Sequence, residues 1–345
     1  MFQRIGQFLN RAVVNTSTFE LDHSVARELL EAFSLRSESI GVRRISGGRS
    51  NENWLIDRGS AGGLVIQRSI RNNPFLEQCS IFANDLRAAE VNCVTYHSAY
   101  NKHVYRYAGQ DFRLMPAMPG VAIASSPDDA LVPNLWTIYE KISQTNCPAV
   151  GMLPPFESTE FFIDRLILKF KSLSNAGALC ALNEALDAEF REIPNGLKTP
   201  PTERWWTLKP SHGDLNIRNF IVNDGEPCLI DFENCAFLPL WHDLGDIVRS
   251  WCSDKNQNLW FISTRKLELV ALLISDFFSI SGDEAIDLAV RSARMVTTKL
   301  CMHLATDFHE RFYYSHNRNT DDSLLQSVAI IRSQMSLLNS LDRLS

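Results

Sequence analysis

The chain has 345 residues, 45% of them hydrophobic and 21% charged, a balance typical of soluble globular proteins. Its 34 basic and 40 acidic residues are scattered and give a net charge of −6, which disfavours a nucleic-acid-binding protein with a basic face. No apolar stretch approaches the roughly 20 residues of a membrane-spanning helix, and the eight cysteines include no C-x-x-C pair. We therefore expect a cytoplasmic protein of about two domains with reduced cysteines, binding neither nucleic acid nor membrane, and its oligomeric state stays open.

The first third of the chain has the pattern of a small β-rich lobe. A helix is predicted over 22–33, where apolar residues recur at helical spacing and Asp22 can cap the first turn. Short runs rich in branched residues, separated by glycine-containing turns, predict strands after it. The predicted elements that follow are strands at 40–45, 53–56 and 64–68, a helix at 74–90 that Pro74 opens, and strands at 104–107 and 112–115.

A proline-punctuated connector, 115–120, ends this pattern, and helical periodicity dominates beyond it. The predicted helices lie at 129–144, 157–173, 176–191, 262–279, 283–306 and 322–343. One hairpin of short strands, 220–222 and 228–231, interrupts them. This order predicts an α+β, protein kinase-like two-lobed fold, with a small β-rich lobe over 1–117 and a larger helical lobe over 118–345.

Polar residues gather around the predicted hairpin. Asp214 lies in the loop before its first strand, Asn219 lies five residues further on, and Asp231 closes the second strand. Phosphoryl transfer requires oxygen ligands for Mg²⁺ on the nucleotide phosphates and a group that orients the attacking hydroxyl. The spacing H-x-D-x-x-x-x-N, which begins at His212, and the later Asp equal those of the protein-kinase catalytic loop and its metal-binding Asp.

These residues receive the following predicted roles. Asp214 is the catalytic base or orienter, while Asn219 and Asp231 hold the metal. His212 organises the loop, Asp243 ties the loop in place by hydrogen bonding, and we expect His242 to be a loop residue. The alternative is a polar loop whose Asp and Asn residues act only as caps, with Asp231 capping a helix.

The segments 211–219, 230–233 and 241–246 resemble the aminoglycoside phosphotransferase and choline kinase-like superfamily of small-molecule kinases. The resemblance implies ATP, Mg²⁺ and a small hydroxylated acceptor. Gln67-Arg68 and the run from Asp243 to Arg249 resemble the N-acetylhexosamine 1-kinase-like branch, which favours a sugar or amino sugar. Choline, ethanolamine, homoserine or an aminoglycoside remain alternative acceptors.

The small lobe supplies the expected nucleotide-binding residues, which are Gly47, Gly48, Ser50, Asn51, Gln67, Met115 and Ala117. The turn 46–51 would lie over the phosphates, because glycines allow close backbone approach, although such a turn is often only a turn. The resemblance implies that backbone groups at 114–118 meet adenine. Gln67 stands where many kinases have a lysine that pairs with the phosphates. This departure leaves open a second hypothesis, a nucleotide-binding pseudokinase that acts as a regulatory module.

Overall fold

The structure, a computed structural model, describes residues 19–35, 40–45, 51–70, 73–154, 201–256, 259–314 and 320–344. Three of the expected nucleotide-binding residues, Gly47, Gly48 and Ser50, lie outside the described residues, as do the helices predicted at 157–173 and 176–191. Within the described part of the chain, no helix is both long and apolar enough to cross a membrane.

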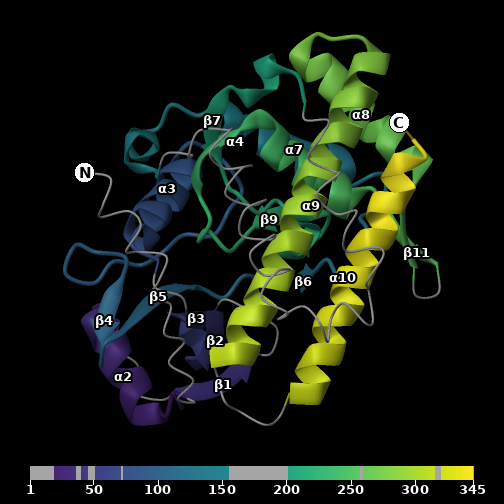
Figure 1. The fold of residues 1–345 in the computed structure, drawn as a ribbon. Coiled ribbons are helices and arrows are strands. Elements are labelled where there is room, and N and C mark those ends of the chain that lie inside the picture. The colour runs from purple at the N-terminus through teal and green to yellow at the C-terminus, as the bar shows by residue number, and fades with distance from the viewer. Residues whose placement is uncertain are drawn as a thin grey trace, which may run out of the picture.

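The first lobe is an antiparallel sheet with a helix packed on it (Figure 1). In the spatial order β1-β2-β3-β5-β4, its strands are β1 (Gly41–Ile45), β2 (Asn51–Asp57), β3 (Gly63–Ser69), β5 (Gln110–Pro116) and β4 (Tyr105–Tyr107), with the short turn η1 (Gly59–Ala61) after β2. Helix α2 (His23–Ala32) begins after Asp22, whose Oδ1 accepts from Val25 N at 2.8 Å, which confirms the predicted N-cap. Leu29 of α2 shares an apolar core with Trp54 and Ile66 of the sheet.

Helix α3 (Leu76–Ala88) follows Pro74, close to its predicted start, but its buried face belongs to the core of the second lobe. Phe82 and Leu86 lie in the same apolar cluster as the buried residues of the later helices. The chain after α3 then pairs with the predicted hairpin, where Val94 N donates to Leu229 O at 2.9 Å. Helix α3 and this segment therefore tie the sheet to the helical lobe.

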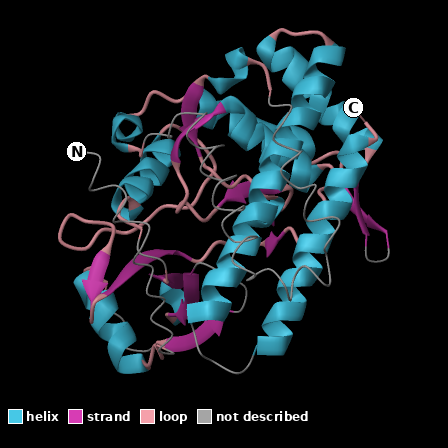
Figure 2. Ribbon diagram, viewed as in Figure 1, coloured by secondary structure: helices cyan, strands magenta, loops and turns pink. Residues whose placement is uncertain are grey.

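The second lobe is dominated by helices. They are α4 (Val132–Gln144), α7 (Leu240–Trp251), α8 (Thr264–Phe278), α9 (Gly282–Tyr314) and α10 (Thr320–Asp342), with the short turns η2 (Pro148–Met152), η4 (Glu203–Trp206) and η5 (Ile217–Asn219). Four predicted helices are confirmed as α4, α8, α9 and α10, although α9 continues further than the sequence indicated. Figure 2 shows α9 and α10 lying side by side along one flank of the molecule.

Helix α7 contradicts the expectation that His242 is a loop residue, and no helix was predicted over this segment. Pro239 precedes it and Gly245 lies within it, and both residues disfavour helix in a sequence-based prediction. The structure overrides this because every residue of α7 is buried and packs against α9. A Cβ at Gly245 would lie 2.4 Å from Ser292 O, so the close approach of the two helices requires glycine there.

The hairpin was predicted as the only strands of the second lobe, and further strands accompany it. Strands β8 (Phe220–Asn223) and β9 (Glu226–Leu229) confirm the hairpin, and β6 (Val121–Ala122) extends it to a three-stranded sheet. Two antiparallel pairs were not predicted, namely β7 (Leu208–Ser211) with β10 (Ala236–Pro239), and β11 (Ser253–Asn256) with β12 (Leu259–Ile262). The pairing of Ser211 with Ala236 closes the base of the whole segment 212–235, which contains the predicted site.

Candidate active site

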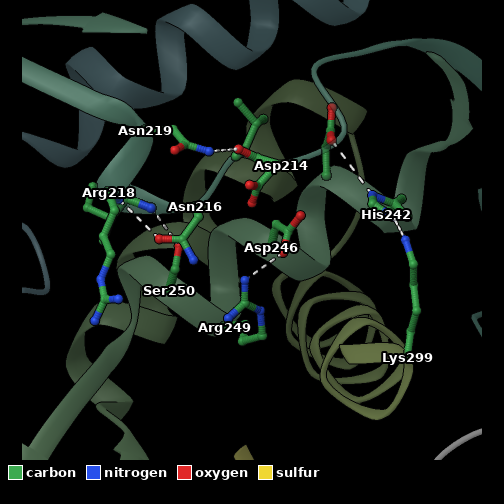
Figure 3. Close-up of polar contacts among 12 residues, drawn as sticks. Asp214, Asn216, Arg218, Asn219, His242, Asp246, Arg249, Ser250 and Lys299 are labelled. Carbon is green, nitrogen blue, oxygen red and sulfur yellow. Dashed lines mark hydrogen bonds and ion pairs between the residues drawn. The ribbon is translucent and has the colours of Figure 1, made fainter. Parts of the chain in front are cut away.

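The loop that carries Asp214 lies between β7 and β8 and rests on helix α7 (Figure 3). Three hydrogen bonds hold it there, from Gly213 N to Asp243 Oδ1 at 3.3 Å, from Trp251 Nε1 to Leu215 O at 3.0 Å, and from Ile217 N to Ser250 Oγ at 3.1 Å. Asp243 thus occupies the supporting position that the sequence analysis gave it. His242, expected in a loop, lies instead in α7.

Gly213 sets how closely the loop approaches the segment after the hairpin. Its φ is +78°, a conformation that residues with side chains adopt at a cost, and a Cβ there would lie 2.2 Å from Asn234 O. The position therefore requires glycine for two independent reasons. The loop with Asp214 and the segment with Asp231 touch at this point.

His212 links the same two segments. Its side chain is fully buried, Nε2 lies 3.0 Å from Ile230 O, and the ring meets Phe232 edge-on at 4.7 Å between centroids. Burial lowers the pKa of His212, so the ring is neutral and its Nε2 donates to the carbonyl. This arrangement is that of a loop organiser, because the ring faces the backbone beside Asp231.

The hairpin brings the three predicted catalytic and metal-binding residues to one end. Asn219 Nδ2 donates to Asp214 O at 2.9 Å, and Ile230 N donates to Asn219 O at 2.8 Å. Asp231 follows β9 with a φ of +67° and caps no helix, because a turn comes after it. The capping alternative for Asp231 is therefore wrong.

The electrostatics at this end of the hairpin suit a hard divalent cation. Burial raises the pKa of both Asp214 and Asp231, and the nearby Glu233 adds to both shifts. Because the Asn219 amide nitrogen donates to Asp214 O, its oxygen is the atom available to a cation (Figure 3). Crowded carboxylates and an amide oxygen form the donor set that Mg²⁺ prefers, and a cation would relieve their repulsion.

Gln67 lies in β3 at the position expected for a lysine, and a residue that the sequence analysis missed sits beside it. Gln67 is paired in register with Arg113 of β5, and both side chains are buried. Arg113 Nη2 donates to Gln67 Oε1, and the Gln67 side chain lies close enough to Asp231 to counteract the rise in the pKa of that carboxyl group. The available signal was an arginine within the otherwise apolar run Phe112–Met115.

The other described nucleotide-binding candidates lie near this point or at the connector. Asn51 Nδ2 donates to Asp231 Oδ1 at 3.2 Å, so its amide reaches across the two lobes to the metal-binding candidate. Met115 is buried in β5, and Ala117 N donates to Gly63 O at 3.0 Å. An adenine contact at Ala117 would therefore use a group other than its N–H.

A second charged cluster lies beneath Asp214, on α7 and α9. Arg249 Nη2 donates to Asp246 Oδ1 at 2.8 Å, and Figure 3 shows this pair beside the Asp214 side chain. Lys299 of α9 contacts His242 Nε2. Burial lowers the pKa of His242 to about 3, so the imidazole is neutral and its Nε2 accepts from the ammonium group.

Sequence reasoning gave Asp246, Arg249 and Lys299 no role. The acid and base three residues apart would have indicated one face of a helix, but the helix itself was not predicted. Burial raises the pKa of Asp246 and lowers that of Lys299. Charged groups kept this close to a candidate catalytic carboxylate are candidates for contact with the acceptor.

The chain is similar to known proteins in sequence pattern and in fold. The sequence model of the phosphotransferase enzyme family matches residues 41–259. No curated protein matches the chain by sequence.

Solved structures share the fold at low sequence identity. A spectinomycin phosphotransferase in complex with ADP and spectinomycin is 13% identical, with 94% of this chain and 100% of that chain covered and a TM-score of 0.70. A Plasmodium vivax ethanolamine kinase is 13% identical, with coverages of 99% and 96% and a TM-score of 0.59. An aminoglycoside phosphotransferase in a ternary complex with ADP and hygromycin B is 12% identical, with coverages of 93% and 99% and a TM-score of 0.57.

Proposed function

The chain belongs to the phosphotransferase enzyme family, and we propose that it transfers the γ-phosphoryl group of ATP, with Mg²⁺, to a hydroxyl of a small sugar or amino sugar. The observation that carries this proposal is the meeting of Asp214, Asn219 and Asp231 at one end of the β8–β9 hairpin. A carboxylate beside two oxygen ligands is the set that in-line phosphoryl transfer requires.

Asp214 accepts the hydrogen bond of the attacking hydroxyl and receives its proton as the new bond forms. Burial raises the pKa of this carboxylate, which makes it a better proton acceptor than a solvated aspartate. The loop needs little rearrangement for this task, because three bonds to α7 already fix it. Positioning of this kind supplies much of the rate in phosphoryl transfer.

Asn219 and Asp231 would hold the magnesium ion. When bound, Mg²⁺ would neutralise the negative charge of the phosphates. Asn51, Gln67 and His212 keep Asp231 and its backbone in place through the contacts described above.

The acceptor proposal is supported by the charged pair beneath Asp214. Asp246 offers carboxylate oxygens and Arg249 offers N–H groups, so the pair matches neighbouring hydroxyls that both donate and accept. A polycationic acceptor would meet Arg249 and Lys299 close to the reacting hydroxyl, which is unfavourable. The modest net charge of −6 points the same way.

An ADP-release screen tests the activity and names the acceptor. The panel contains glucose, N-acetylglucosamine, galactosamine, choline, ethanolamine, homoserine and spectinomycin, each with ATP and Mg²⁺. We expect turnover with a sugar or amino sugar, and Asp214→Asn should lower it by about 10² to 10⁴, the usual contribution of a positioned base.

Asp224→Asn is the matched control, because Asp224 is exposed in the turn of the same hairpin. It should keep turnover within about twofold. Turnover of Asp214→Asn within about threefold of the wild type would remove the assigned role. Binding of ATP and Mg²⁺ measured by calorimetry, with no transfer to any acceptor, would favour the regulatory pseudokinase.

A further inference from the structure

We propose that Arg113 is a positioning residue of the nucleotide site, and that its guanidinium supplies through Gln67 the positive charge that a lysine at position 67 would bring to Asp231. The inference rests on the proposed function, in which Asp231 binds the Mg²⁺ ion that accompanies ATP. It goes further by explaining how this chain forms a nucleotide site without the lysine.

The first step is the placement of the charge. Arg113 pairs with Gln67 across β3 and β5, and only 1% of Arg113 is exposed. The guanidinium of Arg113 donates to the amide oxygen of Gln67, to the carbonyl oxygen of Phe232 at 3.0 Å and to the hydroxyl of Ser80 at 3.5 Å. It also lies over the ring of Tyr96, 4.5 Å from the ring centroid. All four are neutral, so they orient the guanidinium without cancelling its charge.

The second step is the orientation of the Gln67 amide. Its Oε1 accepts from Arg113, so the amide nitrogen is the atom left to face Asp231, and Gln67 acts to lower the pKa of that carboxyl group. With no donor at position 113 the amide could turn and present its oxygen to the carboxylate, which would repel it. A hydrogen bond from a cation also polarises the amide and strengthens the bond that its N–H makes.

The third step is the backbone beside Asp231. Asp231 has a φ of +67°, which costs an aspartate energy and persists only where neighbours hold it. Arg113 Nη1 donates to the carbonyl of the next residue, Phe232, across the two lobes. Arg113 therefore fixes the carboxylate of Asp231 through Gln67 and its main chain through Phe232.

The test first removes the positive charge at position 113 and then places a positive charge at position 67. We expect Arg113→Met to weaken the affinity for ATP with Mg²⁺, measured by calorimetry, by about 10- to 100-fold, the usual effect of losing a partner behind a metal ligand. Affinity for ATP with EDTA should change less. Adding Gln67→Lys to Arg113→Met should restore at least about tenfold of the Mg²⁺-dependent affinity, because the lysine ammonium then lies beside Asp231.

Arg68→Met is the matched control for loss of a buried arginine. Arg68 follows Gln67 on the opposite face of β3, where it pairs with Glu52 and lies over the Phe19 ring. We expect this variant to lower the melting temperature and to leave the affinity for ATP with Mg²⁺ within about threefold. A purely structural arginine at 113 would behave in the same way.

Two results would overturn the inference. One is wild-type affinity in Arg113→Met, and the other is a folded double variant in which Gln67→Lys restores none of the lost affinity. If Arg113→Met does not fold, Arg113→Lys replaces it. We expect this variant to lose about tenfold of the affinity for ATP with Mg²⁺, because a lysine cannot bridge Gln67 and Phe232. Unchanged affinity in Arg113→Lys would also overturn the inference. Failure of the wild type to bind ATP with Mg²⁺ would instead count against the proposed function.

Discussion

The two segments that meet at the candidate active site are held from different sides of the molecule. The loop 212–219, with Asp214, is bonded to α7 within the helical lobe. The segment 230–235, with Asp231, is bonded to residues of the small lobe and of α3. These hydrogen bonds join Asn51 to Asp231, Arg113 to Phe232, Asn73 to Glu233 and Cys79 to Cys235. The position of Asp214 is therefore set within one lobe, whereas the position of Asp231 depends on how the two lobes sit together.

This difference suggests that the two segments contribute to different functions of the site. A movement between the lobes would act on Asp231 through its bond to the small lobe, whereas Asp214 and Asn219 would keep their bonds within the helical lobe. Substitutions on the α7 side should therefore act on turnover and acceptor binding, and those on the small-lobe side on the affinity for nucleotide with metal. Gly213 belongs to both sides, because the two segments touch there.

The largest effect is expected at Gly213, where the two segments touch. In Gly213→Ala the new Cβ would lie 2.2 Å from Asn234 O, and the residue would keep a φ of +78° at a further cost. Displacing either carboxylate by about 1 Å costs on the order of 10² in rate. We expect turnover to fall by that factor and the affinity for ATP with Mg²⁺ to fall with it.

Gly225→Ala separates backbone strain from the clash. Gly225 has a φ of +83° in the hairpin turn, with open space where a Cβ would be. This variant should lose about 1 kcal/mol of stability and keep turnover and nucleotide affinity. If Gly213→Ala reduced turnover alone and left nucleotide affinity intact, the contact with Asn234 would not join the two segments.

The next effect concerns the stability of the α7 side. His242 faces Asp243, Asp246 and Arg249 of its own helix and Lys299 of α9, and burial lowers its pKa from 6.5 to about 3. A lowered pKa means that His242 stabilises the fold above pH 6.5 and that this contribution is lost as the pH falls from 6.5 toward 3. Linkage gives a loss of about 2 kcal/mol between pH 7 and pH 5.

His242→Gln removes the titration and keeps an oxygen for Lys299. We expect its free energy of unfolding in urea to fall about 2 kcal/mol less than that of the wild type between pH 7 and pH 5. His23→Gln, at an exposed histidine of α2, should follow the wild-type curve. Equal pH dependence in His242→Gln and the wild type would show that the imidazole titrates freely.

The same division separates what the sequence could predict from what it could not. The strands of the small lobe, the hairpin and the cap of α2 follow from local patterns of branched residues, glycines and Asp22, and all were predicted close to their observed bounds. The positions of Asp214, Asn219 and Asp231 were accessible for the same reason, because they lie on one loop and hairpin. Local order in the sequence is enough where the contacts are local.

The elements that were missed depend on distant contacts. Helix α7 was not predicted, because its polar residues are accommodated by bonds to a loop some thirty positions earlier, as Asp243 is by its bond to Gly213. Arg113 reaches a backbone carbonyl 119 positions later, at Phe232. The role of a buried charged residue depends on its distant contact partner, and composition and periodicity do not identify that partner.

The smallest effect, and the sharpest test of the division, is expected at Asp246. Asp246→Asn keeps the shape of the side chain and an oxygen for Arg249 but loses the carboxylate charge beside Asp214. If the pair binds the acceptor, the KM for the best acceptor of the screen should rise about tenfold, the value of one hydrogen bond to a charged group. The affinity for ATP with Mg²⁺ should stay within about twofold, since the hydrogen bond to the Asp231 side chain comes from Asn51 of the small lobe.

Asp287→Asn is the matched control for Asp246→Asn. Asp287 forms an ion pair with Arg291 at 2.7 Å on the exposed face of α9, where such pairs contribute little. It should leave the KM unchanged, and the melting temperatures of both variants show whether either loses its fold. An unchanged KM in a folded Asp246→Asn variant would place Asp246 and Arg249 outside the acceptor site. A loss confined to the affinity for ATP with Mg²⁺ would mean that α7 also determines the position of Asp231. A rise in KM with unchanged affinity for ATP with Mg²⁺ is the result expected if the α7 side and the small-lobe side of the site can be altered separately.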